Sequence, residues 1–414
     1  MIFFIYQFLL SIILIFSPII VIIRILKDKE DKLRFKEKFC FISKERGNGK
    51  LVWFHGSSVG EILSVIPIIK KYDNDKSIGK ILITSSTLSS SRILEKIKFK
   101  KTIHQFYPID HAIFSRKFLD YWKPNIAIFL ESEIWPSMFK SIKNRNILLI
   151  LLNARITKRS FDRWSKFKEF SYSIFGLIDK AYSQNSETNH YLKRLNVKNI
   201  KSIGNMKFIE DDYIKSGKSD KKLFSQFKKY KTFIAASTHE TEELFAAKTH
   251  ILLKKKNKNI ITIIIPRHIN RVKQIIAEIN ELGLNVVSRS SKKLKLKDID
   301  IFIVDTFGET KKFYKFATTV FLGKSIVKGG GQNPLEPARF GAKILHGPDV
   351  NNFKDVYKYL RKLKISSVVN SPQKCANSII FKKNMKKVQK MKYLGSTILK
   401  KTLNELDKSI HNEI

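Results

Sequence analysis

The chain has 414 residues, of which 43% are hydrophobic, so it can form two ordinary domains with buried cores, and a disordered protein is excluded. Its 79 Lys and Arg against 36 Asp and Glu give a formal net charge of +43, which suits an anionic membrane surface or a nucleic acid. No basic stretch has the aromatic interleaving or zinc-finger spacing of a nucleic-acid-binding protein, so we expect compositional drift toward Lys, a membrane-surface partner and no nucleic acid. The two cysteines, Cys40 and Cys375, offer neither a disulfide framework nor a metal cluster and indicate a reducing compartment.

The N-terminal segment predicts a retained membrane anchor over residues 1–26. The run from Ile2 to Ile23 has no charge, and at about 1.5 Å per residue it is long enough to cross a hydrocarbon core of about 30 Å. No basic region precedes this run and no small-residue cleavage site follows it, which argues against a cleaved signal peptide. The basic stretch "RILKDKEDKLRFKEK" follows at once, so the remaining chain is expected on the cytoplasmic side.

Beyond the anchor, short apolar runs alternate with amphipathic, Lys-rich segments, which is typical of βα units and a buried parallel sheet. Two series of such runs predict an α/β protein with two doubly wound, Rossmann-like domains, at 27–210 and 232–414, joined by a polar linker at 211–231. The tail after Lys382 has helical apolar spacing. We assign it to the second domain and leave open whether it packs back on the first. The expected strands lie at 51–55, 81–86, 126–132, 147–155, 232–238, 261–268, 301–306, 318–325 and 342–348.

Acidic residues stand directly after two strands of the first domain, where ligands of open α/β sheets bind. In "HGSSVGE", Glu61 lies in the first turn of an apolar helix, where N–H groups and the helix dipole are expected to hold the carboxylate ionised and able to accept a proton. In "ESEIWP", strand alternation predicts that Glu131 and Glu133 point the same way. A first-turn cap and a structural ion pair remain the alternative roles of these residues.

The second domain carries a glycine-rich loop, "KGGGQNPLEPARFGAKILHGP". Glycines 329–331 permit close backbone approach, so their N–H groups are expected to bind a phosphate, and Glu336 could accept hydrogen bonds from a ribose diol. A tight turn before a helix is the simpler alternative. Neither GxxxxGK[ST] nor GxGxxG is present, so a nucleotide site of another kind is predicted.

Other common catalytic patterns are missing from the sequence. Histidines 55, 239 and 268 follow strands, but none has HxxxH or HExxH spacing, so no metal site and no cofactor are predicted. The serines after the strands lack a GxSxG context, which argues against a hydrolase triad.

Taken together, eight motifs in this order resemble the 3-deoxy-D-manno-octulosonic acid (Kdo) transferases, membrane-anchored glycosyltransferases of lipid A assembly. The resemblance extends from the anchor to about Phe353 and implies a GT-B fold, with two Rossmann-like domains facing a cleft. It also implies inverting transfer of Kdo from CMP-Kdo to a lipid A precursor, lipid IVA, at the cytoplasmic face of the inner membrane, in lipopolysaccharide inner-core biosynthesis. The motifs are "HGSSVGE", "ESEIWP", "NARITKRS", "GNMKF", "STHETEE", "PRH", "DTFGE" and "GGGQNPLEP".

Site roles carry over from the resemblance residue by residue. Glu61 corresponds to the general base that takes the proton of the acceptor hydroxyl, and Glu131 and Lys207 correspond to residues that stabilise the transition state. The sequence departs from the family in reading "GKS" at Gly323 to Ser325 in place of "GGS", and "GGGQN" in place of a "GGHN" pattern. The implied CMP-binding residues are Pro266, Arg267, Phe307, Gly308, Glu309, Asn333, Pro334, Leu335 and Glu336.

Two other functions remain compatible with the sequence. One is another GT-B transferase that uses a UDP-sugar on a lipid-linked acceptor. The other is a non-catalytic basic protein that binds membrane or nucleic acid through its charge, which would bind in a strongly salt-dependent way.

Overall fold

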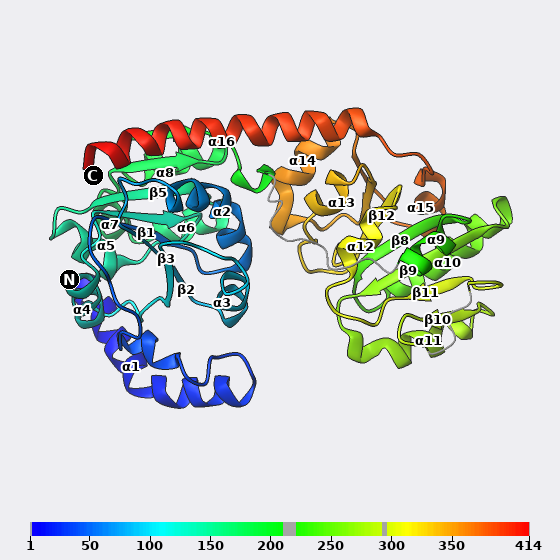
Figure 1. Cartoon of the computed structure of the whole chain (residues 1–414), viewed down its shortest axis with the longest axis horizontal. Helices are drawn as coiled ribbons and strands as arrows, with labels where there is room; N and C mark the ends of the chain where they lie inside the picture. Colours follow the sequence, from blue (N-terminus) through cyan, green and yellow to red (C-terminus); the bar gives the residue numbers. More distant parts are fainter. Residues whose placement is uncertain (1, 210–220, 292–295, 414) are drawn as a thin grey trace. The chain divides into compact units, whose positions relative to one another are not determined.

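The computed structural model describes residues 2–209, 221–291 and 296–413, which fold into two compact units (Figure 1). Unit 1 comprises Met1–Tyr213 and Leu394–Ile414, and unit 2 comprises Ile214–Tyr393. Each unit contains a seven-stranded sheet in which every pair of neighbouring strands is parallel. This confirms the predicted α/β class with two Rossmann-like sheets and an N-terminal apolar helix.

The sheet of unit 1 has the order β3-β2-β1-β4-β5-β6-β7. Along the chain, β1 is the first strand of the sheet, and β2 and β3 are added on one side of it. The next strand, β4, pairs with β1 on its other side, so the direction of winding reverses between β1 and β4. The elements are α1 (Ile2–Leu26), η1 (Phe35–Phe39), β1 (Leu51–His55), α2 (Val59–Asp73), β2 (Lys80–Ser85), α3 (Leu88–Leu94), β3 (Thr102–Phe106), α4 (Ala112–Trp122), β4 (Ile126–Leu130), α5 (Pro136–Lys143), β5 (Leu148–Ala154), α6 (Lys158–Ser165), α7 (Lys168–Phe175), β6 (Lys180–Ser183), α8 (Ser186–Arg194), β7 (Ile200–Ser202), η2 (Met206–Phe208) and α16 (Met385–Glu413).

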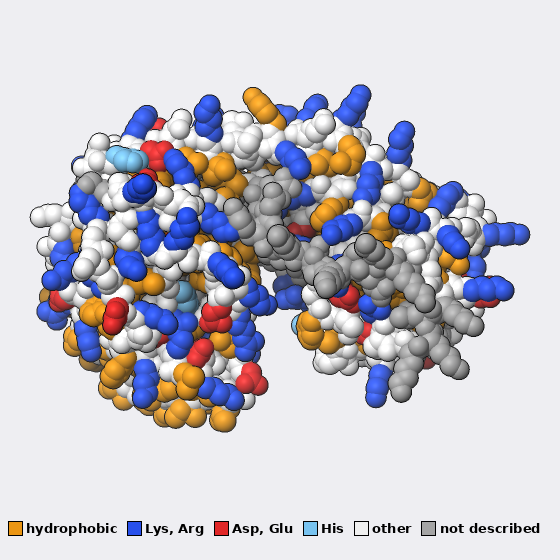
Figure 2. Space-filling view, viewed as in Figure 1, with side chains coloured by type: hydrophobic (Ala, Val, Ile, Leu, Met, Phe, Trp, Pro, Cys, Tyr) orange, Lys and Arg blue, Asp and Glu red, His pale blue; other side chains and the backbone are white. Residues whose placement is uncertain are grey.

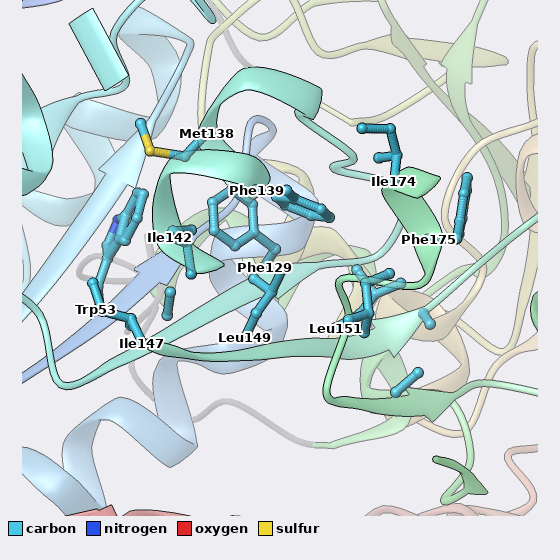
Figure 3. Close-up of a cluster of buried hydrophobic side chains, with 14 of the residues drawn as sticks. Trp53, Phe129, Met138, Phe139, Ile142, Ile147, Leu149, Leu151, Ile174 and Phe175 are labelled. Atoms are coloured by element: carbon cyan, nitrogen blue, oxygen red, sulfur yellow. The ribbon is translucent and has the colours of Figure 1, made fainter. Parts of the chain in front are cut away.

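Aromatic packing fixes the two central strands of this sheet. Every residue of β1 and β4 is buried, which explains their continuous apolar sequences. The Trp53 ring centroid lies 4.9 Å from that of Phe118 and 5.0 Å from that of Phe129, and Phe129 packs edge-on against Phe139 of α5 (Figure 3). The carboxyl ends of β1 and β4 are therefore held on a rigid support.

Unit 2 repeats the plan with the order β10-β11-β9-β8-β12-β13-β14, and its winding reverses between β8 and β12. Its elements are α9 (Lys221–Phe227), β8 (Lys231–Thr238), α10 (Glu242–Lys256), β9 (Ile260–Pro266), η3 (Ile269–Arg271), α11 (Val272–Asn280), β10 (Val286–Ser288), β11 (Ile301–Ile303), α12 (Thr310–Tyr314), β12 (Thr319–Leu322), α13 (Leu335–Arg339), β13 (Lys343–His346), η4 (Asn351–Phe353), α14 (Lys354–Lys362), β14 (Ser366–Val368) and α15 (Pro372–Ser378).

The long terminal helix α16 divides between the units, in contrast to the predicted domain 232–414. Its residues from Leu394 onward belong to unit 1. The Tyr72 hydroxyl donates to Asp407 Oδ1 at 2.8 Å, and Lys201 Nζ lies 2.8 Å from Glu405 Oε2. These contacts with α2 and β7 explain why the tail is part of unit 1.

The predicted linker at 211–231 is described only in part. Residues 211–220 lie outside the described residues, and the remainder contains α9 and the first residue of β8. In the described ranges, α1 is the one helix long and apolar enough to cross a membrane, by length and composition only.

Candidate active site

The winding reversal in unit 1 brings together the loops that follow β1 and β4. The loop after β1 leads into α2 and carries Glu61, and the turn after β4 carries Glu131 and Glu133. The charges of Glu133 and Glu131 both act on Glu61. The structure therefore groups the predicted residues Glu61 and Glu131, and it adds Glu133, to which the sequence assigns no catalytic role.

Glu61 is fixed by a capping box at the start of α2. The Ser58 hydroxyl accepts from the Glu61 N–H at 3.3 Å and donates to Glu61 Oε1 at 2.9 Å. The Ser57 N–H donates to Glu61 Oε2 at 2.7 Å, and the Ser58 N–H lies 3.3 Å from the same oxygen. These bonds explain why the helix begins at this point and hold the carboxylate in one orientation.

The surroundings of Glu61 make it a carboxylate that titrates near neutral pH. Burial, followed by the charges of Glu133 and Glu131, raises the pKa of Glu61 to about 7, against hydrogen bonds from Ser58 that lower it. The sequence-based expectation of a fully ionised carboxylate is wrong, because burial and two neighbouring acids outweigh the hydrogen bonds and the helix end. A group with a pKa near the working pH is suited to general base catalysis.

Glu133 is the ionised neighbour of Glu61. Its Oε2 lies 2.5 Å from Ser57 Oγ, 2.9 Å from Trp135 Nε1 and 3.3 Å from His55 Nε2. Burial acts to raise the pKa of Glu133, but these hydrogen bonds, that of His55 first, outweigh it and hold the pKa below its ordinary value. Two acids whose pKa values are separated by their surroundings can perform different tasks at one pH.

His55 orients Glu133 from the buried end of β1. Its Nδ1 lies 2.9 Å from Thr84 Oγ1, which also accepts from Trp53 Nε1 at 2.9 Å. The Thr84 hydroxyl can then donate to Nδ1, so that Nε2–H donates to Glu133. From the sequence, His55 is considered only as a zinc ligand. The sequence feature that could have indicated its role beside Glu133 is its position at the end of an apolar strand, next to "GSS".

Glu131 and Lys207 form the second half of the site. Lys207 Nζ lies 2.7 Å from Glu131 Oε1, in an ion pair that is mostly buried. Glu131 has a left-handed φ of 52° and follows the end of β4, so strand alternation does not align it with Glu133 as the sequence predicts. Asn153, at a β-bulge with φ 54°, accepts from the Met206 N–H at 3.0 Å and places η2, which carries Lys207.

In unit 2, a buried carboxylate organises the loop after β12. Glu242 accepts from the N–H groups of Lys324 at 2.7 Å and of Ser325 and Ile326 at 3.0 Å each. Gly323 must lack a side chain, because a Cβ there would lie 2.4 Å from the Ser237 carbonyl oxygen. The first and last residues of "GKS" are thus structural, and Lys324, with φ 57°, turns its side chain over Gly329.

The sequence predicts that the glycine-rich loop presents free amides to a phosphate. In the structure these amides already have partners within the protein. The N–H groups of Gly329 and Gly330 donate to Asp349 Oδ2 at 2.9 and 3.0 Å, and the Gly331 N–H donates to the Lys324 carbonyl at 2.7 Å. The amide of Gly329 foremost holds the pKa of Asp349 below its ordinary value. This carboxylate occupies the position expected for an anion, so the loop is closed on itself.

Arg267 directly follows β9 and has an exposed guanidinium group. Its N–H donates to the Thr238 carbonyl at 3.0 Å, while its side chain is exposed next to the buried Pro266. The His239 and His268 rings lie edge to face with centroids 5.6 Å apart. A guanidinium in this position can form paired hydrogen bonds with a phosphate.

The "DTFGE" motif divides into a structural acid and an exposed tip. Glu309 lies 3.1 Å from Arg289 Nε and 3.0 Å from Lys312 Nζ. Burial acts to raise the pKa of Glu309, but bonds from Thr306, Lys312 and Arg289 outweigh it and lower the pKa. Phe307 is 81% exposed and Gly308 has φ 79°, so these two residues are open to a ligand while Glu309 braces the loop.

The "NPLE" residues contribute two polar side chains. Pro334 and Leu335 are buried, whereas Asn333 is exposed and its Oδ1 accepts from the Leu335 N–H at 3.1 Å. Glu336 is half-exposed, with Lys311 Nζ 3.9 Å away. Within the described ranges, no three His, Cys, Asp or Glu residues form a group that could hold a metal ion.

The two-unit fold is similar to that of several solved structures. The crystal structure of a UDP-N-acetylglucosamine 2-epimerase superposes with a TM-score of 0.56 at 12% identity, covering 87% of this chain and 97% of that chain. The crystal structure of Anabaena Alr3699/HepE in complex with UDP and glucose matches with a TM-score of 0.52 at 11% identity, covering 89% of this chain and all of that chain. At these identities the likeness establishes a GT-B-like architecture alone.

Sequence comparison identifies the family. The family model described as 3-deoxy-D-manno-octulosonic-acid transferase (kdotransferase) matches residues 33–210. The chain is 33% identical to the 3-deoxy-D-manno-octulosonic acid transferase of Rickettsia bellii over 90% of this chain and 89% of that protein. It is 26% identical to the transferase of the same name from Haemophilus influenzae over 77% of this chain and 76% of that protein. The chain belongs to the 3-deoxy-D-manno-octulosonic acid transferase family and is a glycosyltransferase.

Proposed function

We propose that this enzyme transfers Kdo from CMP-Kdo to a lipid A precursor, lipid IVA, with inversion at the sugar carbon, in lipopolysaccharide inner-core biosynthesis. The observation that carries the proposal is the carboxylate of Glu61, oriented by Ser57 and Ser58, with a pKa of about 7 beside the ionised Glu133. Such a group accepts a proton from a sugar hydroxyl at neutral pH and releases it afterwards.

The transfer consists of one displacement. Glu61 takes the proton of the acceptor hydroxyl as that oxygen forms a bond to the anomeric carbon of Kdo. The bond between this carbon and the phosphate oxygen breaks, and its electron pair leaves with CMP. Because the acceptor attacks from the face opposite to the phosphate, the configuration inverts.

The Glu131–Lys207 pair supplies both signs of charge that the transition state requires. The sugar carbon becomes more positive as CMP departs, and the Glu131 carboxylate can stabilise this charge. Lys207, held 2.7 Å from Glu131, offers an ammonium group to an anionic substrate group. Their low exposure strengthens both interactions relative to water.

Unit 2 is proposed to bind the donor nucleotide. The exposed Arg267 guanidinium fits the phosphate, and Phe307 offers a flat apolar surface for the base or sugar. The Asn333 amide can donate hydrogen bonds to the ribose hydroxyls or accept them, and the Glu336 carboxylate can accept hydrogen bonds from the same hydroxyls. Glu309, Pro334 and Leu335 act in this proposal by bracing the two loops.

We further propose that the enzyme acts at the cytoplasmic face of the inner membrane and that α1 attaches it there. The apolar helix has Arg24 in its last turn and is followed by the exposed Lys27, Lys29 and Lys32, which suit an anionic lipid surface. An enzyme held at that surface meets a lipid acceptor directly.

Purified full-length enzyme with CMP-Kdo and tetraacylated lipid A precursor tests the proposal. We expect a glycosylated lipid and free CMP, and we expect Glu61→Gln to lower turnover by about 10²- to 10⁴-fold, the usual contribution of a general base, while CMP still raises the melting temperature. Glu187→Gln is the matched control, because Glu187 also lies in the first turn of a unit 1 helix but is exposed. Near-normal turnover of Glu61→Gln would show that another group is the base.

The same preparation separates the alternatives. If the donor were a UDP-sugar, UDP and not CMP would protect unit 2 from thermal unfolding. If the protein were a non-catalytic basic binder, substitution of Glu61, Arg267 and Glu336 would leave its binding unchanged, and binding would fall steeply with salt.

A further inference from the structure

Helix α1 has two chemically distinct faces. Its partly or fully buried residues recur every three or four positions, which makes a single stripe along the helix. All its hydroxyl, amide and charged side chains lie on this stripe. The stripe consists of Ile2, Phe3, Tyr6, Gln7, Leu10, Ser11, Leu14, Ser17, Val21, Arg24 and Ile25.

The stripe is docked onto unit 1 through specific polar contacts near the N-terminus of α1. The Tyr6 hydroxyl donates to Asp110 Oδ2 at 2.7 Å. Gln7 uses both ends of its amide, because Nε2 donates to Ser137 Oγ at 2.6 Å and Oε1 accepts from the Ala112 N–H at 3.1 Å. These partners stand before or within the first turns of α4 and α5, and the Gln7 side-chain carbonyl oxygen satisfies the first N–H group of α4.

The other end of α1 is also held to unit 1. Arg24 Nε lies 3.0 Å from Glu30 Oε2, and Lys38 Nζ lies 2.7 Å from the same oxygen. The Glu30 carboxylate is buried at this junction. Helix α1 is therefore fastened near its N-terminus to residues of α4, α5 and the loop before α4, and near its C-terminus to the segment that follows it.

The opposite face of α1 is entirely apolar and exposed. Figure 2 shows hydrophobic side chains along the lower edge of unit 1, where Figure 1 places α1. More than half of the large exposed hydrophobic residues in the described chain belong to this face. They are Phe4, Ile5, Phe8, Leu9, Ile12, Ile13, Ile15, Phe16, Ile19, Ile20, Ile22, Ile23 and Leu26.

Cationic side chains border this apolar face. Lys27, Lys29 and Lys32 are exposed just beyond the helix, and Lys140 Nζ lies 3.7 Å from the centre of the Phe3 ring. An apolar face bordered by lysines complements a bilayer with anionic headgroups.

We infer that α1 lies in the plane of the membrane interface, with its polar stripe docked on unit 1 and its apolar face in the lipid, and does not cross the bilayer. The inference rests on the proposed membrane location of the enzyme. A spanning helix would have to break the contacts of Tyr6 and Gln7 with Asp110, Ser137 and Ala112, and it would carry the Gln7 amide into hydrocarbon without its partners. The in-plane arrangement keeps the contacts of Tyr6, Gln7 and Arg24 and still buries the apolar face.

The position of the N-terminus distinguishes the two arrangements. The full chain, with a short polar tag and a protease site ahead of Met1, is produced in bacteria, and inside-out vesicles of the inner membrane are treated with protease. We expect the tag to be cleaved in sealed vesicles as readily as after detergent is added. A tag protected until detergent is added would overturn the inference, because the helix would then cross the bilayer.

Transfer activity in the same vesicles separates this inference from the proposed function. A protected tag with normal Kdo transfer would refute the in-plane helix alone. A cleaved tag without Kdo transfer would refute the proposed function alone. Failure to bind vesicles, with a dimer in solution, would assign the apolar face to a second copy of the chain and overturn the inference.

A pair of opposite substitutions tests which face meets lipid, with vesicles of phosphatidylethanolamine and phosphatidylglycerol. Leu9→Gln is expected to weaken vesicle binding by about tenfold, the effect of withdrawing one leucine from an apolar environment. Gln7→Leu is expected to leave vesicle binding unchanged and to accelerate deuterium exchange of the Ala112 amide. Tighter vesicle binding by Gln7→Leu, with unchanged exchange at Ala112, would show that Gln7 faces lipid and would overturn the inference.

Discussion

The elevated pKa of Glu61 makes a stability prediction that does not depend on substrate. The folded state raises the pKa from 4.5 to about 7, whereas the unfolded chain keeps the ordinary value. The folded protein therefore binds this proton more tightly. The stabilising contribution of the protonated carboxyl is complete below pH 4.5 and is lost as the pH rises toward 7.

The structure also sets the magnitude of this effect. The shift from 4.5 to about 7 is about 2.5 pKa units, which at about 1.36 kcal/mol per unit corresponds to roughly 3 kcal/mol. Glu61 is partly exposed, so solvent screening reduces the expected value to about 1–2 kcal/mol. Glu61→Gln keeps an acceptor for the Ser57 N–H but carries no charge. The variant should exceed the wild type in free energy of unfolding by about 1–2 kcal/mol at pH 8 and by much less at pH 5.

Tryptophan fluorescence is a specific assay for this effect, because Trp53, Trp122, Trp135 and Trp164 all lie in unit 1. Urea unfolding of both proteins at pH 5 and pH 8 gives the difference directly, with Glu187→Gln as the control that should show no such dependence. A Glu61→Gln protein less stable than the wild type at pH 8, or a difference equal at both pH values, would refute the assigned environment of Glu61.

Three further predictions concern other parts of the site. Glu131→Gln should lower kcat by at least about tenfold with little change in the CMP dissociation constant, and a change in CMP binding alone would contradict its assigned role. Asp349→Ala should destabilise unit 2 by about 1–3 kcal/mol at neutral pH, seen as faster deuterium exchange at Gly329 and Gly330, and should lose this effect as the pH falls below the ordinary aspartate pKa. Unchanged exchange would show that the loop does not need this carboxylate. Phe129→Ala should cost unit 1 about 3–5 kcal/mol by tryptophan fluorescence, and a loss below about 1 kcal/mol would contradict the packing in Figure 3.

The central strands could be predicted from sequence because burial on both faces makes them continuously apolar. The run at 51–55 coincides with β1. Edge strands gave no such signal. Residues of β3, "TIHQF", are half-exposed at its start, and β7, "IKS", is largely exposed, so neither needs an apolar sequence. Apolar spacing in the tail predicted a helix but left its packing open, because its partners Tyr72 and Lys201 lie far away in the chain.

In the site, too, local sequence indicated the position of a residue but not its distant partners. The position of Glu61 after an apolar strand indicated a base, but its pKa depends on burial and then on Glu133. The low pKa of Glu133 depends in turn on hydrogen bonds from His55 and Ser57. No local pattern contains that network. The glycine loop shows the converse, because Asp349, which binds its amides, lies about twenty residues further along the chain. Long-range hydrogen bonds thus decide which polar motifs remain available to a ligand.

The mass of the lipid product is the most direct test of the central claim. Full-length enzyme is incubated with CMP-Kdo and tetraacylated lipid A precursor, and the lipid is examined by mass spectrometry. We predict a lipid heavier by one or more Kdo units with the wild type and with Glu187→Gln, and, over the same incubation, almost entirely unmodified precursor with Glu61→Gln. An unmodified lipid with folded, CMP-binding wild-type enzyme, or full modification by Glu61→Gln, would contradict that claim.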